Sequence, residues 1–563
     1  MKLNKNIYGY SFSILMLAFA TSGFAQTGSE EKDKKTETGS TPGITEEIEV
    51  VRPYKPVLAD ASKIRRSPDL NSKKPFKPTL SYNVLDNRLE LNSDIKQLQA
   101  QQLVAEQRAA LRNNLVKIGV GNLNTGLGEI YINNGNDEAL QAGFFLKHLN
   151  QEGSINGQKI SQQEAAVFGR SIMDAITLNG ELGFDRLRTN FYGVTPGNLD
   201  PDADVEKQRF STISLKGELL KNQSENNEAE FNYAAKADLY LLRSYDEGKE
   251  NSFAISAFLN KAWNQFNFGV NTSADFTKTR DAAYDIANNL FRVNPYIKFQ
   301  GANYKLILGL NLVQEFGTDS RTNLLPAVSA EFPVVPGYAT IFGGFTGDVL
   351  KSSLRNFSNE NPYLMNNIGI ANAVEKSNIY GGVRGNGGAG FGFKAAVFFK
   401  SIQDMPLFVN NPTDPRKFDV IYDDGNSKIV GFEGEVSVNA SETFTWTGKI
   451  NMNNYKMSTE KEAWHKPDFR LISNARLSVN NKVAVDAEVV LNGQSQAKIF
   501  AALEESQVSI KSFVDFSAGA EYRFREKVGL YLRVNNMFGN GYQQYLYYPK
   551  FGLNVLGGFN YSF

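Results

Sequence analysis

Residues 266–277 read FNFGVNTSADFT, and apolar residues such as Phe266, Phe268, Val270 and Phe276 recur at every second position. The positions between them carry Asn, Gly, Ser, Asp and Thr. A period of two places all residues of one parity on the same face of a β-strand. The stretch therefore predicts a strand with one apolar face and one polar face.

The same alternation recurs from residue 113 to residue 563. Each run is close to the ~9–11 residues that a tilted strand needs to cross a bilayer. Counting the runs predicts about 22 strands, within a range of about 16 to 22, and an even number follows if both ends lie on one side of the membrane. The clearest further runs are residues 291–299, 304–312, 430–439, 444–453, 469–479, 483–491, 514–524 and 528–534.

The connections between these runs are of two kinds. A soluble sandwich has no reason to sort its loops by length, whereas a membrane barrel has short periplasmic turns and longer extracellular loops. We therefore predict an all-β transmembrane protein, a large antiparallel outer-membrane barrel, with Asp275, Lys298, Glu433 and Asp486 facing a watery lumen. The expected tight turns are 300–301, 480–481 and 525–526, and the expected long loops are 279–289, 351–376, 401–427, 455–468 and 493–511.

The composition agrees with a barrel. The chain has 40 Phe, 24 Tyr and 48 Gly, yet its mean hydropathy is only −0.35, a mixture that suits strands with lipid on one side and water on the other. Basic and acidic residues balance at 60 each, so no nucleic-acid partner is expected. With no cysteine, the chain has no disulfide framework, thiolate metal site or lipoprotein anchor.

The first 112 residues are of a different kind. Residues 1–25 are typical of a cleaved signal peptide, with Lys2 and Lys5 before an apolar run and a small residue, Ala25, at the cleavage site. Residues 26–112 form an expected periplasmic or lumenal segment that begins as a polar tether. A helix is predicted near residues 94–112, where Asn92 and Ser93 offer an N-cap.

The chain ends in an amphipathic strand whose last three outward positions are Phe559, Tyr561 and Phe563. A free aromatic end-strand can pair with the open edge of an assembly machine. We therefore predict that these three residues form a barrel-assembly signal. The expected partners at this end are the assembly machinery during insertion and, afterwards, outer-membrane lipids.

The segment VNNMFGNGY at residues 534–542, followed by Tyr548-Pro549 and the final strand, resembles the C-terminal end of TonB-dependent receptors. Residues 395–404 and 431–435 also resemble a loop and strand of that barrel. The resemblance is close over residues 376–563 and only general over residues 113–375. It implies transport of a solute across the outer membrane.

A short acidic and aliphatic run near the start is similar to a TonB box, the strand that pairs with an energising periplasmic protein by adding to its open edge. A strand or linker with no partner is the alternative. The resemblance is incomplete, because only residues 52–112 lie between this run and the barrel, so the family's plug domain is absent or reduced. The box-like residues are Glu46, Glu47, Ile48, Glu49, Val50 and Val51, within a strand predicted at 44–51.

Two functions remain open: a receptor-like transporter or pore, and a non-transporting scaffold subunit of an outer-membrane complex. An enzyme is not expected, nor is a cofactor or metal. The two histidines, His148 and His465, are interpreted as girdle or loop residues, and Asp423-Asp424 and Asp202/Asp204 as solvated turn residues. Aromatic residues near strand ends are expected in interfacial girdles: Trp263, Trp446, Tyr522, Tyr531, Tyr545, Tyr547 and Tyr548.

Overall fold

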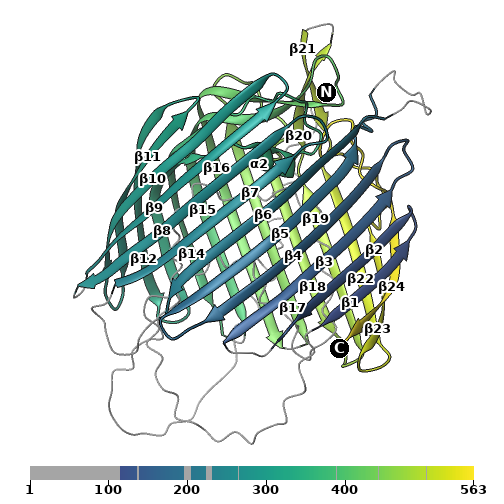
Figure 1. Ribbon diagram of the computed structural model, residues 1–563, viewed down its shortest axis with the longest axis horizontal. Coiled ribbons are helices and arrows are strands. Elements are labelled where there is room, and N and C mark those ends of the chain that lie inside the picture. The colour runs from purple at the N-terminus through teal and green to yellow at the C-terminus, as the bar shows by residue number, and fades with distance from the viewer. Residues whose placement is uncertain are drawn as a thin grey trace, which may run out of the picture.

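The alternating segments form strands that run side by side around a wall (Figure 1). The computed structural model describes residues 114–135, 139–195, 205–222, 231–263, 266–388, 390–441, 443–501 and 504–563. In these ranges it contains a 22-stranded antiparallel sheet and a separate two-stranded hairpin. The predicted fold and strand number are confirmed.

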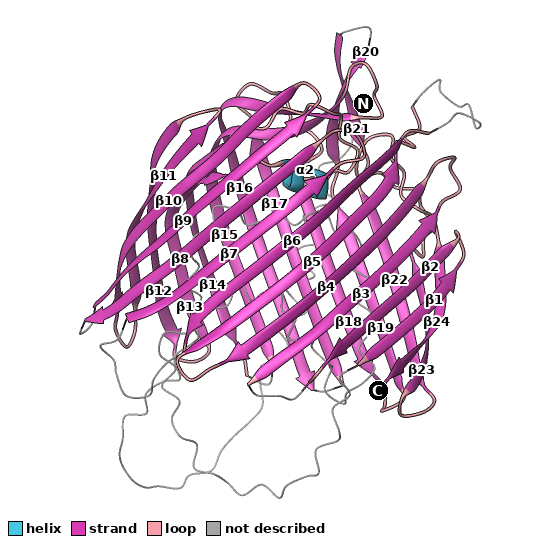
Figure 2. Cartoon of the chain, viewed as in Figure 1, coloured by secondary structure: helices cyan, strands magenta, loops and turns pink. Residues whose placement is uncertain are grey.

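Only one helix, α2, lies in the described part of the chain, and almost everything else there is strand (Figure 2). No helix among those residues is long and apolar enough to cross a bilayer. The elements are β1 Leu115–Gly121, β2 Thr125–Asn133, β3 Leu140–Glu152, β4 Lys159–Ile172, β5 Ile176–Asn190, β6 Lys207–Lys221, β7 Phe231–Arg243, β8 Lys249–Trp263, β9 Phe266–Asp281, β10 Tyr284–Gln300, β11 Lys305–Gly317, β12 Arg321–Val335, β13 Ala339–Leu350, α2 Leu354–Glu360, β14 Ala373–Asn386, β15 Phe391–Asn410, β16 Phe418–Ser441, β17 Phe444–Lys456, β18 Phe469–Ser478, β19 Val483–Asn492, β20 Ser495–Ala501, β21 Glu504–Ile510, β22 Phe513–Arg523, β23 Val528–Asn535 and β24 Asn554–Ser562.

The sheet closes on itself because its first and last strands pair. β1 pairs with both β2 and β24, and Ile118 lies opposite Phe559 in the second pairing. Backbone bonds of 3.2 and 3.1 Å between Asn114 and Phe563 continue this ladder to the end of the chain. The ring therefore runs from β1 to β19 and then through β22, β23 and β24, with no free edge in the wall.

The two faces of the wall have opposite chemistry, as the stretch 266–277 illustrates. Phe268 and Phe276 on β9 are 42% and 46% exposed, and they point outward. Thr277, at the next position, is buried, and Asp275 forms an ion pair inside the barrel. An outward belt of exposed apolar side chains is what hydrocarbon requires of a spanning barrel.

The two rims differ. Both ends of the barrel sequence and the turns 301–304, 479–482 and 524–527 lie at one rim, as expected for the periplasmic side. The opposite rim, which we call the mouth, carries the long connections. Two of the loop predictions are wrong: β9 and β10 pair up to a tight turn at 282–283, and β15 and β16 extend to leave only 411–417 as loop.

One long mouth connection folds into a hairpin of its own, β20 with β21, which rises above the rim (Figure 1). Its base packs on the mouth through Ala497, Ile510 and Leu546. Its outer strand exposes Glu504 and its three following residues. The hairpin is thus attached to the barrel by an apolar base and offers a polar surface above it.

Barrel closure generates a test at two adjacent glycines of β24. A Cβ on Gly558 would lie 2.0 Å from the carbonyl oxygen of Ile118 across the closing pair, whereas one on Gly557 has no atom nearer than 3.8 Å. We expect Gly558→Ala to impair closure, because the obstructing atom is backbone that cannot move aside. Heat-modifiable migration on gels measures closure. Gly557→Ala is the matched control, and equal folded fractions for the two variants would contradict the closure argument.

Candidate functional site

The connection between β13 and β14, residues 351–372, folds inward at the mouth and is called the mouth loop below. It contains α2, which lies within the outline of the barrel near its upper rim (Figure 2). Ser353 caps the helix, and its hydroxyl accepts the backbone N–H of Asn356 at 3.1 Å. Leu354, Phe357 and Ser358 are the buried residues of this helix.

The start of the mouth loop is held by one buried carboxylate of the barrel wall. Glu250 on β8 accepts the backbone N–H groups of Leu354 at 2.7 Å and Arg355 at 3.0 Å. It also accepts the hydroxyls of Tyr240 at 2.9 Å and Thr279 at 2.6 Å. Because Glu250 has no exposed surface, these four donors replace its lost hydration and attach α2 to the wall.

The end of the mouth loop is held by a second polar network. Arg321 on β12 donates to the carbonyl of Asn372 at 2.9 Å and pairs with Glu315 at 2.6 Å and Asp404 at 3.0 Å. The side chain of Asn372 donates to Asn288 at 2.7 Å and to Glu315 at 2.9 Å. Both ends of the loop are therefore anchored to strands, and its middle lies across the mouth.

The middle of the loop belongs to an apolar core that joins opposite walls. Phe210 lies on β6 and Phe418 on β16, ten strands apart in a ring of 22, and both belong to the same buried cluster. Tyr363 of the mouth loop stacks on Tyr548 at 3.5 Å between ring centroids. We call this cluster the cap core; its members are Tyr192, Phe210, Tyr240, Leu242, Leu354, Phe357, Leu364, Ile368, Ile370, Phe408, Phe418, Val420, Tyr545 and Tyr548.

Polar contacts reinforce the same bridge across the mouth. Lys417, between β15 and β16, pairs with Glu206 beside β6 at 2.7 Å. The hydroxyl of Tyr192 donates to the carbonyl of Pro549 at 3.0 Å, and that of Tyr548 donates to the carbonyl of Arg416. The mouth is thus spanned by packed loops. The expected girdle positions of Tyr545 and Tyr548 are wrong, as is that of Tyr531, which is buried on the inner side of β23.

His465, between β17 and β18, is a buried part of this closure. Its Nδ1 donates to the carbonyl of Phe408 at 3.0 Å, and its Nε2 lies 3.5 Å from the donating N–H of Leu546. Burial lowers the pKa of His465 to about 4, so the ring is neutral near pH 7. A neutral ring can donate and accept at once, and His465 uses both roles to join three segments of the mouth.

Asp423 corrects another expectation, since it is no solvated turn residue. It lies on β16 with no exposed surface and accepts backbone N–H groups of Ser458, Thr459 and Glu460 at 2.7–2.8 Å. Ser427 adds a hydroxyl at 2.5 Å. The carboxylate therefore fixes the loop that carries His465 in the way that Glu250 fixes α2.

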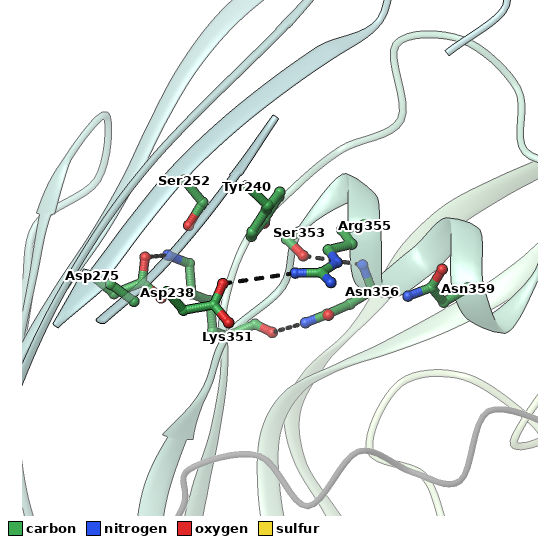
Figure 3. Close-up of a pocket in the computed structure, with 10 residues that line it drawn as sticks. Asp238, Tyr240, Ser252, Asp275, Lys351, Ser353, Arg355, Asn356 and Asn359 are labelled. Atoms are coloured by element: carbon green, nitrogen blue, oxygen red, sulfur yellow. Dashed lines mark hydrogen bonds and ion pairs between the residues drawn. The ribbon is translucent and has the colours of Figure 1, made fainter. Parts of the chain in front are cut away.

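A cavity of about 350 Å³ lies against the inner wall beneath α2 (Figure 3). Strands β7, β8 and β9 contribute Asp238, Tyr240, Ser252, Ala254 and Asp275. The mouth loop contributes Lys351, Ser353, Arg355, Asn356 and Asn359. This cavity combines ionised groups of both signs with amides and hydroxyls, and it is our candidate site.

The residues singled out in the sequence form three groups: lumenal residues, outward-facing residues, and residues outside the described ranges. The lumenal groups Asp275, Glu433 and Asp486 form ion pairs with Lys351, Lys394 and Arg533, and Lys298 is buried. His148 is exposed on β3, and the outward faces of Phe559, Tyr561 and Phe563 are 40–47% exposed. Outside the described residues lie the signal peptide 1–25, the helix near 94–112, Asp202 and Asp204, and the box-like run Glu46, Glu47, Ile48, Glu49, Val50 and Val51.

Sequence reasoning did not find Glu250, Arg355 or Asp238. Glu250 follows Gly248 and Lys249 at the start of a strand, where an acidic residue resembles any solvated turn residue. Its donors come from β7, β9 and the mouth loop, up to 105 positions away. The usable signals were the length of the mouth loop and the helix start at Ser353.

No family model and no curated protein matches the sequence. Solved outer-membrane barrels do match the structure. The FrpB iron transporter from Neisseria meningitidis (F3-3 variant) has a TM-score of 0.62 at 12% identity, covering 81% of this chain and 82% of that one. The pyoverdine outer membrane receptor FpvA from Pseudomonas aeruginosa PAO1 gives 0.61 at 12%, with 81% and 79% covered. The ferric-catecholate import receptor Fiu from K12 E. coli gives 0.60 at 11%, with 80% and 82% covered.

At such identities the matches establish the fold. The predicted resemblance to the barrel of TonB-dependent receptors is confirmed at that level. The likeness to outer-membrane barrels and the apolar outer belt agree with the predicted outer-membrane location.

The contacts of Glu250 generate a test of how the mouth loop is held. Glu250→Gln keeps one acceptor oxygen and replaces the other by an NH₂, which can only donate, so two of the four donors lose their acceptor. We expect the loop attachment to lose roughly 2–4 kcal/mol, because buried donors are left without an acceptor. Hydrogen–deuterium exchange of the backbone amides of residues 351–372 in the folded protein reports this loss as faster exchange.

Glu433→Gln is the matched control. Glu433 is also a lumenal glutamate, but it pairs with Lys394 and Lys449 on the wall, away from the mouth loop. Exchange in the mouth loop should stay unchanged in this variant. If Glu250→Gln exchanged no faster than Glu433→Gln, the carboxylate would not be the anchor.

Proposed function

We propose that this protein is an outer-membrane transporter of the receptor type, which admits a small solute through its lumen, and that the mouth loop is the moving part of its extracellular closure. The observation that supports this most directly is the cap core, which bridges opposite walls over a lumen lined with ionised groups. A barrel of this width must be filled or it leaks.

The construction of the closure supports movement rather than permanent filling. Glu250 and Arg321 attach the ends of the mouth loop through hydrogen bonds and ion pairs. Between them, the loop meets β16 and the neighbouring mouth connections through side-chain packing, the isolated bridge between Leu364 and Phe418, and an ion pair between Glu360 and Lys466. A loop held there by side chains and one bridge can leave these neighbours while its ends stay in place, and loop movements of this kind gate many sites.

A scaffold subunit is the second candidate, and the β20–β21 hairpin favours it. The hairpin rises above the rim and is attached at its base by apolar packing and by the ion pair between Lys498 and Glu460 (Figure 1). A polar hairpin outside the lumen would suit docking to another subunit or to a surface protein. A pure scaffold needs no opening of the mouth, which separates the two proposals experimentally.

The two candidates differ in what a locked mouth does. We expect the double variant Leu364→Cys/Phe418→Cys to form a disulfide when oxidised, because paired β-bridge residues lie within the ~4.4–6.8 Å Cα range that disulfides need. Conductance of the full chain in planar bilayers should be lower when oxidised than when reduced, because the bond holds the middle of the loop to β16 across the mouth.

The reduced form of the same variant controls for the two lost side chains. The natural chain has no cysteine, so it should not respond to oxidant or reductant. Equal conductance of the oxidised and reduced forms would exclude gating by the mouth loop and favour the scaffold.

The box-like run Glu46–Val51 is proposed to pair as a strand with a periplasmic energising protein, as in TonB-dependent receptors. Its support is the acidic and aliphatic sequence and the shared barrel fold. We expect Val50→Pro/Val51→Pro to lose co-purification of such a protein from native membranes, because proline removes backbone donors that strand addition uses. Thr36→Pro/Thr38→Pro in the tether is the matched control, and retention of the partner by the Val variant would refute the box.

A further inference from the structure

Two ion pairs line the cavity at the mouth loop, and they differ in the distance between their charged groups (Figure 3). Lys351 contacts Asp275 closely and also donates to the hydroxyl of Thr277 at 2.7 Å, so this pair is satisfied within the protein. Arg355 and Asp238 face each other at 4.0 Å between Nη1 and Oδ1. The second pair is at the limit of an ion pair and too long for a hydrogen bond.

The side chains of Arg355 and Asp238 have unused hydrogen-bonding capacity. Among the described residues, neither the guanidinium nor the carboxylate makes a hydrogen bond. About a quarter of each side chain is exposed, so a ligand can reach both groups. The guanidinium lies over the ring of Tyr240 at 4.4 Å, which holds its plane in place. The cavity therefore presents a fixed planar donor beside a free acceptor.

The charges of the cavity restrict what can bind there. Two cationic and two anionic side chains line it, so its lining has no net charge. A simple anion would meet Asp238 and Asp275, and a simple cation would meet Arg355 and Lys351. A sugar ring usually stacks on an aromatic face, but the face of Tyr240 is covered by Arg355. The remaining class is a small molecule that carries both charges close together.

We propose that this cavity binds a small zwitterion with an ammonium and a carboxylate on one carbon, that is, an α-amino acid or the like. The ammonium sits on Asp238 and the carboxylate on Arg355. This assignment rests on the proposed transport function and names the chemical class of its solute. A volume of about 350 Å³ is of the size that small-ligand pockets have.

The geometry of such a ligand matches that of the loose pair. By standard bond lengths, the nitrogen and carboxylate oxygens of an α-amino acid are on the order of 3 Å apart. Asp238 and Arg355 are 4.0 Å apart, so the two pairs can lie antiparallel, with each charge next to its opposite. A planar guanidinium takes a carboxylate through two parallel hydrogen bonds, which a lysine could not do.

The other lining groups suit the remainder of an amino acid. Asn356 donates one amide hydrogen to the carbonyl of Lys351 at 3.2 Å, which fixes its side chain at the cavity edge. Asn359 lies one turn further along α2 (Figure 3). Ala254 is the one aliphatic side chain of the lining. A small side chain fits such a lining better than a large apolar one.

Three probes with one skeleton test the charge requirement: alanine, N-acetylalanine, which lacks the ammonium, and alanine amide, which lacks the carboxylate. Calorimetric titration or saturation-transfer NMR on the full chain in detergent measures their binding. We expect alanine to bind about tenfold or more tightly than either singly charged probe, because each of these leaves one protein charge unpaired.

Three variants at two residues locate the binding. Asp238→Asn and Arg355→Gln should each weaken alanine binding about tenfold or more. Arg355→Lys keeps the charge but not the planar fork, and it should recover only part of the loss. Glu433→Gln is the matched lumenal control and should bind as the natural chain does. Heat-modifiable migration shows that each variant is folded.

The proposal is overturned if alanine does not bind, if N-acetylalanine, alanine amide or glycerol binds as tightly, or if the folded Asp238 and Arg355 variants bind alanine normally. These outcomes are separate from failure of the transport function. A redox-dependent conductance without alanine binding would leave the gated barrel and reject the ligand class. Alanine binding without redox-dependent conductance would leave the ligand class and reject gating by the mouth loop.

Discussion

Hydrocarbon offers no hydrogen-bond partner, so every backbone N–H and C=O that lies in a bilayer must be paired within the protein. A sheet meets this condition only when it has no edge, and here the condition is met where β1 pairs with β24. Gly558 shows how tightly that junction is built, because the carbonyl of Ile118 occupies the space a side chain would need. Outward apolar side chains, inward polar ones and two distinct rims all follow from a wall that closes in this way.

A closed wall of 22 strands encloses a wide interior, and loops rather than strands cover that interior at the mouth. The cap core joins β6 to β16 across the ring, and its packing is that of a small apolar core in an otherwise polar interior. Stability there comes from aromatic and aliphatic burial, whereas position is set by buried carboxylates. Glu250 accepts two N–H groups of the mouth loop and Asp423 accepts three of the β17–β18 connection, so each carboxylate fixes a loop at one point.

The ion pairs of the lumen wall are of two kinds, those whose hydrogen-bonding capacity is used within the protein and those whose capacity is not. Arg292 with Asp348, and Lys351 with Asp275, are buried pairs that hold elements together. Isolated charges could not be buried there, because desolvation would exceed any gain. The loose pair of Arg355 and Asp238 differs because a quarter of each side chain is exposed in the cavity, and its capacity for hydrogen bonds is therefore available to a ligand.

The sequence by itself determined the class of fold, the strand number and the direction in which side chains face. Alternation with a period of two is a local property, so stretches such as 266–277 carry it without any knowledge of distant contacts. The sequence also placed Asp275, Glu433 and Asp486 on the lumenal side, because that assignment needs only parity.

Only the tertiary structure decided what the mouth does. Tyr545 and Tyr548 were assigned to girdles because they lie near expected strand ends, and His465 to a loop because it lies in a long connection, yet all three are buried against segments more than fifty positions away. The same holds for Glu250, whose donors come from three elements, and for the cavity shared by β7, β8, β9 and the mouth loop. A strand's facing direction is encoded in adjacent residues, whereas a loop's position depends on which distant groups it meets, and local sequence does not contain that information.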